Sequence, residues 1–160
     1  MNALETPNPV HVDSQPGHLI RRLHQIAVGL FVQETETLGI TPMQYAALQT
    51  VQQQPGMDQR TLARSIALDA STTGGVVDRL EARQLLERRT SPADRRVRLL
   101  HVTAGGDALL QRITPMMLQA QQRILDPLSP EQRQQFMDML GLLVDSNNDH
   151  SRTPSDPRRS

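Results

Sequence analysis

Arginines are concentrated in one stretch of this chain. Nine arginines lie between Arg60 and Arg98 against five acidic residues, although basic and acidic residues are equal at 17 each over the 160 residues. Every basic residue is arginine, since the chain contains no lysine. A guanidinium group binds a phosphate or a guanine edge through two hydrogen bonds, so this stretch is a candidate surface for nucleic acid. Because a GC-rich genome would also favour arginine, position is more informative here than residue type.

The composition excludes several other kinds of chemistry. The absence of cysteine rules out disulfides, thiolate metal sites and a cysteine nucleophile or redox switch. Phe31, Tyr45 and Phe136 are the only aromatic residues, too few for a platform that stacks single-stranded bases. No apolar run approaches the roughly 20 residues that cross a bilayer, and the first 16 residues lack the regions of a signal peptide. We therefore expect a cytoplasmic protein with no membrane contact and no cofactor.

Two short helices at the start of the basic stretch are candidates for a helix-turn-helix. A helix over 42–53 precedes them, because Thr41-Pro42-Met43-Gln44 has the residues of a capping box with proline at the first helical position. Asp58 can cap a helix over 59–66, and a connection of about three residues leads to a helix over 70–84. Many helical hairpins share this pattern, so the pair of helices is weak evidence by itself.

A β-hairpin is predicted directly after the second of these helices. Residues 85–89 and 97–102 have the composition of strands, and residues 90–96 that of a turn. The turn contains Asp94-Arg95-Arg96, so its tip is basic. A helix-turn-helix followed by such a hairpin is a winged helix.

The remaining predicted elements are helical. A helix over 17–38 ends at Gly39, a plausible C-terminal cap, and Thr103 caps a long helix to residue 125 that Pro115 should kink or split. Ser129-Pro130-Glu131-Gln132 begins a last helix over 130–144. The polar, proline-containing segments 1–16 and 146–160 are expected to be disordered tails, which leaves a folded region over 17–145.

This order of elements and two local motifs resemble the MarR family of bacterial transcription regulators. The first motif, Leu68-Asp-Ala-Ser-Thr-Thr-Gly-Gly-Val-Val-Asp78-Arg79-Leu80-Glu81, is similar to the family's recognition helix and its D-R-L-E continuation. The second, Ser91-Pro92-Ala93-Asp94-Arg95-Arg96 followed by Leu100-His-Val-Thr103-Ala-Gly105, is similar to its D-x-R wing and L-T-x-x-G strand exit. The resemblance covers roughly residues 18–145. It implies a mainly α fold with a small β-hairpin wing: a winged helix-turn-helix at about 42–103, with dimerisation helices at about 17–38 and 103–145.

The helix over 70–84 is expected to enter the major groove with its N-terminal end first. The residues expected to contact DNA are Thr61, Ala70, Ser71, Thr72, Gly74, Gly75, Arg79, Asp94, Arg95 and Arg96. The two mid-helix glycines cost roughly 1 kcal/mol each relative to alanine; they either let the backbone approach DNA or serve tight helix packing. Arg79 either reaches a phosphate or pairs with an acid of its own helix. The resemblance implies that Arg96 enters the minor groove and that Asp94 steadies it, while Arg95 flanks it on a phosphate; otherwise these three form a solvated turn.

The resemblance also implies a twofold dimer that reads a pseudo-palindromic operator. The first helix and the last two contain much of the leucine and methionine that such an interface requires, although these residues could instead close a monomeric core. Many family members release DNA when a small aromatic or phenolic acid binds. His18 and Arg22, with Met43 and Tyr45, are the candidates for such a site here, although His18 and Arg22 are also ordinary surface groups.

Three other classes of protein fit the sequence less well. The five histidines have no tight ligand spacing, which disfavours a metal-responsive regulator. No phosphate-binding loop and no H-E-x-x-H or G-x-S-x-G motif occurs, which disfavours an enzyme. A winged helix that binds protein instead of DNA would usually lack a basic wing. The sequence therefore favours a homodimeric DNA-binding repressor.

Overall fold

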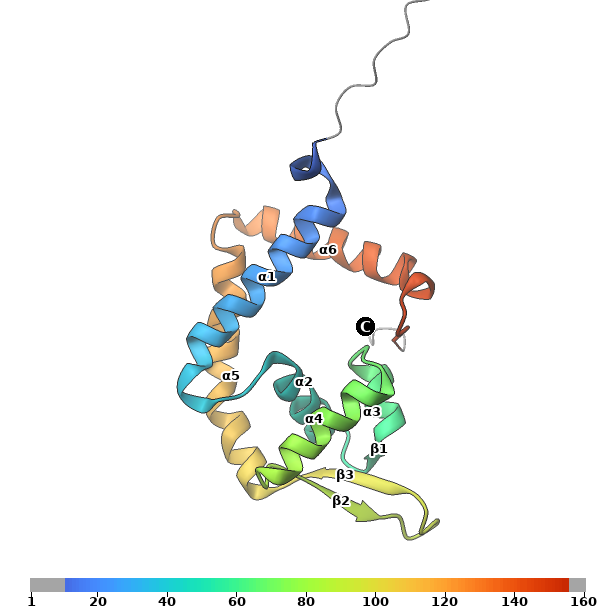
Figure 1. The fold of residues 1–160 in the computed structure, drawn as a ribbon. Coiled ribbons are helices and arrows are strands. Elements are labelled where there is room, and N and C mark those ends of the chain that lie inside the picture. The colour runs from blue at the N-terminus through green and yellow to red at the C-terminus, as the bar shows by residue number, and fades with distance from the viewer. Residues whose placement is uncertain (1–10, 156–160) are drawn as a thin grey trace, which may run out of the picture.

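The computed structural model describes residues 11–155 of the chain (Figure 1). In chain order its elements are the 3₁₀ turn η1 (Val12–Ser14), α1 (Pro16–Thr35), the 3₁₀ turn η2 (Glu36–Leu38), α2 (Pro42–Gln53), β1 (Met57–Asp58), α3 (Gln59–Ser65), α4 (Ala70–Ala82), β2 (Leu86–Thr90), β3 (Arg98–Val102), α5 (Ala104–Leu125), α6 (Pro130–Ser146) and the 3₁₀ turn η3 (Asn148–His150). The predicted mainly α fold with a β-hairpin wing is confirmed.

Residues 42–102 form the winged-helix unit, in which α2, α3 and α4 pack beside a small antiparallel sheet. The strand order is β1-β3-β2. β2 pairs with β3 from Leu86 opposite Val102 to Thr90 opposite Arg98. The sequence predicted these two strands but not β1, because a strand of two residues has no alternation to detect. Pairing with β1 ties the segment before α3 to the wing.

One hydrophobic core joins the winged-helix unit to α5. Its largest fully buried side chains come from α2, α3, α4, β2, β3 and α5, and include Leu48, Leu62, Leu80, Leu86, Leu100, Leu110 and Ile113. Leucine and isoleucine of this kind supply the dispersion contacts that a core almost without aromatic residues needs. α4 is therefore held against a packed core.

Side-chain caps begin the helices where the sequence predicted them. Both capping boxes are present, Thr41 with Gln44 at α2 and Ser129 with Gln132 at α6. Gly39 ends the first helical segment with φ of 56°, a left-handed conformation that glycine adopts without strain. These local signals determine the helix boundaries because their hydrogen bonds form between residues close in sequence.

Pro115 was expected to kink or split the long helix, and the helix is not split. α5 runs without interruption from Ala104 to Leu125 with Pro115 inside it. Directly before the proline, the hydroxyl of Thr114 donates a 2.7 Å hydrogen bond to the carbonyl of Leu110. Packing against the core keeps the helix continuous, because Leu109, Leu110 and Ile113 are buried immediately before Pro115 and Ala120 is buried after it. The tertiary contacts override the local preference of proline.

The described part of the C-terminal segment contacts the winged-helix unit. Residues 1–10 and 156–160 lie outside the described residues. In the described part of the C-terminal segment, the side chain of Asn148 exchanges hydrogen bonds with the backbone of Ser155 at 3.0 and 3.1 Å. The Thr153 hydroxyl donates a 2.8 Å hydrogen bond to the carbonyl of Ala67, in the turn between α3 and α4. Residues 148–155 are therefore drawn back toward the winged-helix unit, as Figure 1 shows.

None of the described helices has both the length and the apolar character needed to span a bilayer.

Candidate nucleic-acid interface

The N-terminal end of α4 is open to solvent. Ala70, Ser71 and Thr72 are exposed, while Thr73 is buried against the core. Asp69 caps the helix, since its carboxylate accepts 2.8 Å and 2.6 Å hydrogen bonds from the amide and the hydroxyl of Thr72. Both bonds lower the pKa of the Asp69 carboxyl, and the bond from the Thr72 hydroxyl has the larger effect. The hydroxyl proton of Thr72 is thus engaged, and this residue can offer DNA an acceptor oxygen or its methyl group.

The two glycines of α4 have different surroundings. A Cβ atom on Gly74 would lie 3.3 Å from the side-chain nitrogen of Gln59 in α3, whereas one on Gly75 would meet only the guanidinium of Arg79 at 4.0 Å. Gly74 therefore serves the packing of α3 on α4. Gly75 leaves the outer surface of α4 bare, which favours close approach of the backbone to a ligand.

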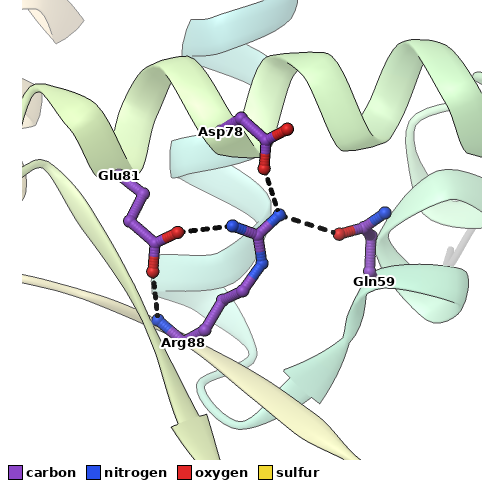
Figure 2. A network of polar contacts seen from close by, with 4 residues as sticks. All are labelled: Gln59, Asp78, Glu81 and Arg88. Atoms are coloured by element: carbon purple, nitrogen blue, oxygen red, sulfur yellow. Dashed lines mark hydrogen bonds and ion pairs between the residues drawn. The ribbon is translucent and has the colours of Figure 1, made fainter.

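Arg88 is the centre of a polar network that the sequence did not predict (Figure 2). From β2 its guanidinium binds the carboxylate of Asp78 at 2.7 Å, the carboxylate of Glu81, and the side-chain oxygen of Gln59 at 3.2 Å. The Arg88 amide also donates to Glu81 at 3.2 Å. Burial alone would lower the pKa of Arg88, but the two carboxylates outweigh burial and hold that pKa above its ordinary value. The network joins the wing to α4 and to α3.

Arg79 is freed for other contacts by this network. The sequence left open an ion pair between Arg79 and an acid of its own helix. In the structure Asp78 and Glu81 bind Arg88 instead. Arg79 is exposed, and its guanidinium lies over Gly75 toward the N-terminal half of α4. This position suits a phosphate contact at the edge of a groove.

The tip of the wing is an exposed turn held by short-range hydrogen bonds. The amide of Arg96 donates a 2.9 Å hydrogen bond to the carboxylate of Asp94, and the amide of Val97 donates at 3.0 Å to the Asp94 carbonyl. Asp94 thus fixes the backbone at Arg96. The side chains of Asp94, Arg95 and Arg96 are all exposed, so two cations project from a turn of defined shape.

Thr61 belongs to the start of α3 and is half-buried. Its amide donates a 2.7 Å hydrogen bond to the carboxylate of Asp58. That bond is the main cause of the lowered pKa of the Asp58 carboxyl, to which the charges of Arg60 and Arg64 also contribute. The role of Thr61 inside the chain is therefore to begin α3, and only part of its side chain is available to DNA.

The four candidate effector residues do not meet within one chain. His18 lies on the first turns of α1, where its Nε2 atom is 3.5 Å from the carboxylate of Asp13. Together with Arg22 and neighbouring apolar residues it lines a shallow hollow of about 460 Å³. Tyr45 contacts Phe31 near the other end of α1, with ring centroids 6.0 Å apart. Phe31 lies 13 positions after His18 on α1, which corresponds to roughly 20 Å along the helix axis.

The pKa of the Tyr45 hydroxyl is raised above its ordinary value. Burial raises this pKa, and its effect exceeds that of a hydrogen bond with Thr114, which lowers it. Met43 is 36% exposed at the start of α2.

A groove of about 910 Å³ runs between α1, α5 and α6. Its walls are almost entirely apolar and are formed by Leu19, Ile20, Leu23, His24, Ala27, Gln121, Ile124, Leu125, Phe136, Met137, Met139, Leu140 and Leu143. Large side chains in it remain solvent-exposed, with Leu19 at 53%, Met139 at 58% and Leu143 at 54%. An apolar surface of this extent is typical of an interaction site.

Gly106 is a further residue whose importance the sequence did not reveal. A Cβ atom there would lie 2.1 Å from the carbonyl oxygen of Leu85 and 2.6 Å from a methyl group of Val102. The resemblance motif was assigned to end at Gly105, where the nearest atom would be 3.4 Å away. Gly106 lets the start of α5 lie against the base of the wing.

Among the described residues, no group of three or more histidine and acidic side chains is arranged to hold a metal ion.

Comparisons with known proteins agree with this geometry. The family described as MarR matches residues 40–97. The HTH-type transcriptional repressor NicR of Pseudomonas putida is 30% identical over 139 residues, which cover 87% of this chain and 88% of NicR. The structure of BpsR from Bordetella bronchiseptica, which concerns regulation of its DNA binding by 6-hydroxynicotinic acid, superposes with a TM-score of 0.82 at 33% identity, covering 86% and 99% of the two chains. The structure of PcaV from Streptomyces coelicolor in complex with its natural ligand superposes with a TM-score of 0.76 at 33% identity. The superposition covers 86% of this chain and 97% of PcaV. These relatives are named as regulators, not as enzymes.

Proposed function

The chain belongs to the MarR family of transcription regulators, and from that premise we propose that it is a homodimeric repressor that binds a pseudo-palindromic operator and is released by a small aromatic acid. The observation that carries the proposal is the joint geometry of α4 and the wing. The exposed end of α4 and the exposed arginines of the wing tip belong to one rigid unit, tied together by Arg88.

In the proposed complex α4 lies in the major groove and the wing reaches the neighbouring minor groove. Ala70, Ser71 and Thr72 contact base edges, and Gly75 lets the backbone of α4 approach them. Arg79 binds a phosphate beside the groove, which gives affinity and register but not sequence choice. Thr61 and Gly74 have structural roles inside the unit, so we assign them at most a peripheral contact.

At the wing, Arg96 enters the minor groove and Arg95 contacts the flanking phosphate. A narrow A/T-rich minor groove has an enhanced negative potential that attracts a guanidinium group. Asp94 contributes through the backbone, since its carboxylate accepts the amide of Arg96 at 2.9 Å.

A second copy of the chain is the proposed occupant of the apolar groove between α1, α5 and α6. Leu19 and Met139 on its walls are more than half exposed in the single chain. Among residues 11–155, α6 makes few contacts beyond η3, so within this part of the chain one face of α6 is left largely uncovered. A twofold pair that interlocks these helices would cover both faces and present two recognition helices to successive half-sites.

The proposed effector is an aromatic carboxylate, and its proposed partners are the imidazole of His18 and the guanidinium of Arg22. They line one hollow with the apolar side chains of Leu19, Leu23 and Ile26, which suit a flat ring. The carboxylate of Asp13 also lines this hollow, 3.5 Å from His18, so an acidic effector would take the place of Asp13 at His18. The relation to BpsR makes 6-hydroxynicotinate the first compound to test. Met43 and Tyr45, distant from His18 in one chain, belong to this site only where the dimer or a closed conformation brings them near.

The first experiment is a gel-shift titration of the purified protein on the DNA upstream of its own gene, repeated with 6-hydroxynicotinate and a panel of hydroxybenzoates. A sharp shift that one acid relieves supports the whole proposal. A shift that no acid relieves retains DNA binding and removes the aromatic effector. If neither this DNA nor random duplex binds at low salt, the proposal is wrong.

The effector site is tested separately with His18→Ala and Arg22→Ala. Both variants should keep operator affinity and lose the response to the acid that releases the parent protein. Arg112→Ala, which removes an exposed arginine of α5, is the matched control. If both site variants respond as the control does, the effector binds elsewhere.

The alternative function, a winged helix that binds a protein partner, predicts a different dependence on salt. Binding to DNA releases counterions, so affinity should fall steeply as salt rises. Two exposed arginines at the wing tip favour DNA over a protein partner.

A further inference from the structure

One arginine of the basic stretch is far from the DNA-reading end of α4. Arg83 is the residue at which α4 ends, and its side chain reaches the connector between α1 and α2. One guanidinium nitrogen donates a 2.7 Å hydrogen bond to the carbonyl of Gly39, and the other donates a 3.1 Å bond to the carbonyl of Leu38. Two bonds from one planar group to successive carbonyls fix the direction of the contact as well as its length.

The carbonyl groups of Leu38 and Gly39 that accept these hydrogen bonds lie in a well-defined part of the connector. Leu38 is buried, with 7% of its surface exposed, and Gly39 adopts the left-handed conformation that ends the helical segment. Carbonyl groups at the end of a helical segment are the negative end of its dipole, so a cation is favoured there. These two hydrogen bonds therefore connect the end of α4 to the end of η2, the 3₁₀ turn that directly follows α1.

A small change of angle at Arg83 would move the opposite end of α4, which carries the proposed DNA contacts. The reading end of α4 at Ala70 is thirteen residues from Arg83, or roughly 20 Å along the helix. A tilt of about 5° at Arg83 would displace the reading end by roughly 1.7 Å, which is about half the spacing of successive nucleotides along a strand. Arg83 thus controls a displacement large enough to misalign base contacts.

We propose that Arg83 is a positioning residue that sets the angle between α4 and α1, and through it the separation of the two recognition helices in the dimer. The inference rests on the proposed function, because it requires a dimer formed through α1, α5 and α6 that binds two half-sites. Arg83 acts without touching DNA, which separates it from Arg79 on the same helix.

The test uses an operator that the full-length parent protein selects from random duplexes, together with versions in which one base pair is inserted or removed between the half-sites. Arg83→Gln and Arg83→Lys are compared with Arg79→Gln, which removes the proposed phosphate contact, and with Arg112→Gln as a control on α5. Affinity is measured over a range of salt concentrations. Thermal unfolding is followed for every variant.

Arg83→Gln should lower affinity for the selected operator about tenfold while leaving the slope of log K against log salt unchanged. Its preference for the selected spacing over the altered ones should shrink. Arg83→Lys, which can keep one of the two bonds, should be intermediate. Arg79→Gln should reduce the salt slope by about 1 and keep the spacing preference, and Arg112→Gln should match the parent.

A fall in salt slope for Arg83→Gln equal to that of Arg79→Gln would overturn the inference, since Arg83 would then bind phosphate. Spacing preferences equal to the parent's in both Arg83 variants would also overturn it. If Arg83→Gln unfolds at the assay temperature, the spacing preference of Arg83→Lys decides. If the parent protein selects no DNA, the proposed function itself is wrong. If the parent selects DNA and both Arg83 variants keep its spacing preference, only the inference about Arg83 is wrong.

Discussion

Replacing Arg88 with methionine is expected to uncouple the wing from the recognition helix. The Arg88 side chain is only 22% exposed, while its partners Asp78 and Glu81 are 68% and 42% exposed. Methionine keeps much of the apolar stem and removes the guanidinium. Because both carboxylates face solvent, they regain water when Arg88 is lost, so the variant does not strand a buried charge.

The expected loss of stability in Arg88→Met follows from the exposure of these side chains. Two ion pairs that are partly open to water contribute about 0.5–1 kcal/mol each, so Arg88→Met should lower the free energy of unfolding by about 1–2 kcal/mol. For a domain of this size that corresponds to a fall in Tm of roughly 3–8 °C. The loss of operator affinity should be larger than the loss of stability suggests, about tenfold or more, because the wing and α4 must contact DNA at the same time.

Arg89→Met is the matched control for this change. Arg89 is the next residue of β2, is 60% exposed and pairs with Glu87 on its own strand, so its replacement should cost less than about 0.5 kcal/mol. Thermal unfolding and gel-shift titration are measured for both variants, and a double-mutant cycle pairs Arg88→Met with Glu81→Gln. Equal effects of the two arginine variants in both assays, together with no coupling to Glu81, would refute the role of the network.

Three further predictions follow from individual contacts. Arg96→Ala should weaken operator binding about tenfold or more with little change in Tm, since alanine keeps the amide that bonds to Asp94; unchanged affinity would remove the wing tip from the interface. Gly106→Ala should destabilise by about 3 kcal/mol or more, because its Cβ would lie 2.1 Å from a carbonyl oxygen, whereas Gly105→Ala should be neutral or slightly stabilising; equal Tm values for the two would contradict the close packing. Asp58→Ala should cost about 1 kcal/mol at neutral pH. The Thr61 amide lowers the folded pKa of Asp58, so this contribution is present above the ordinary carboxyl pKa of about 4 and is lost as the pH falls through the folded value; a difference in Tm that stays constant into acid would exclude the charged cap as its cause.

Local chemistry made much of this fold predictable. The boxes formed by Thr41 with Gln44 and by Ser129 with Gln132 close between residues three apart, so their effect is readable from the sequence. The basic wing turn was equally readable, because Asp94 and Arg96 are two apart and their hydrogen bond is local. The family motifs then supplied the order of the elements.

The sequence alone does not show contacts whose partners are far apart in the chain or effects that depend on the tertiary environment. Pro115 was expected to kink or split the long helix, and core packing keeps that helix unsplit. His18 and Tyr45 were grouped into one site; His18 lies on the first turns of α1, whereas Tyr45 contacts Phe31 near the other end of that helix. The hydrogen bond from Thr153 to the carbonyl of Ala67, 86 residues earlier, is a contact that no local pattern records.

The sequence by itself therefore determined the helix starts, the wing and the basic stretch, because each depends on neighbours within about one helical turn. Only the tertiary structure decided what the individual arginines do. Arg88 binds the carboxylates available to Arg79, and Arg83 bonds to carbonyls 44 and 45 residues away. A guanidinium group takes whichever acceptors packing brings within about 3 Å, and no spacing along the chain records that choice.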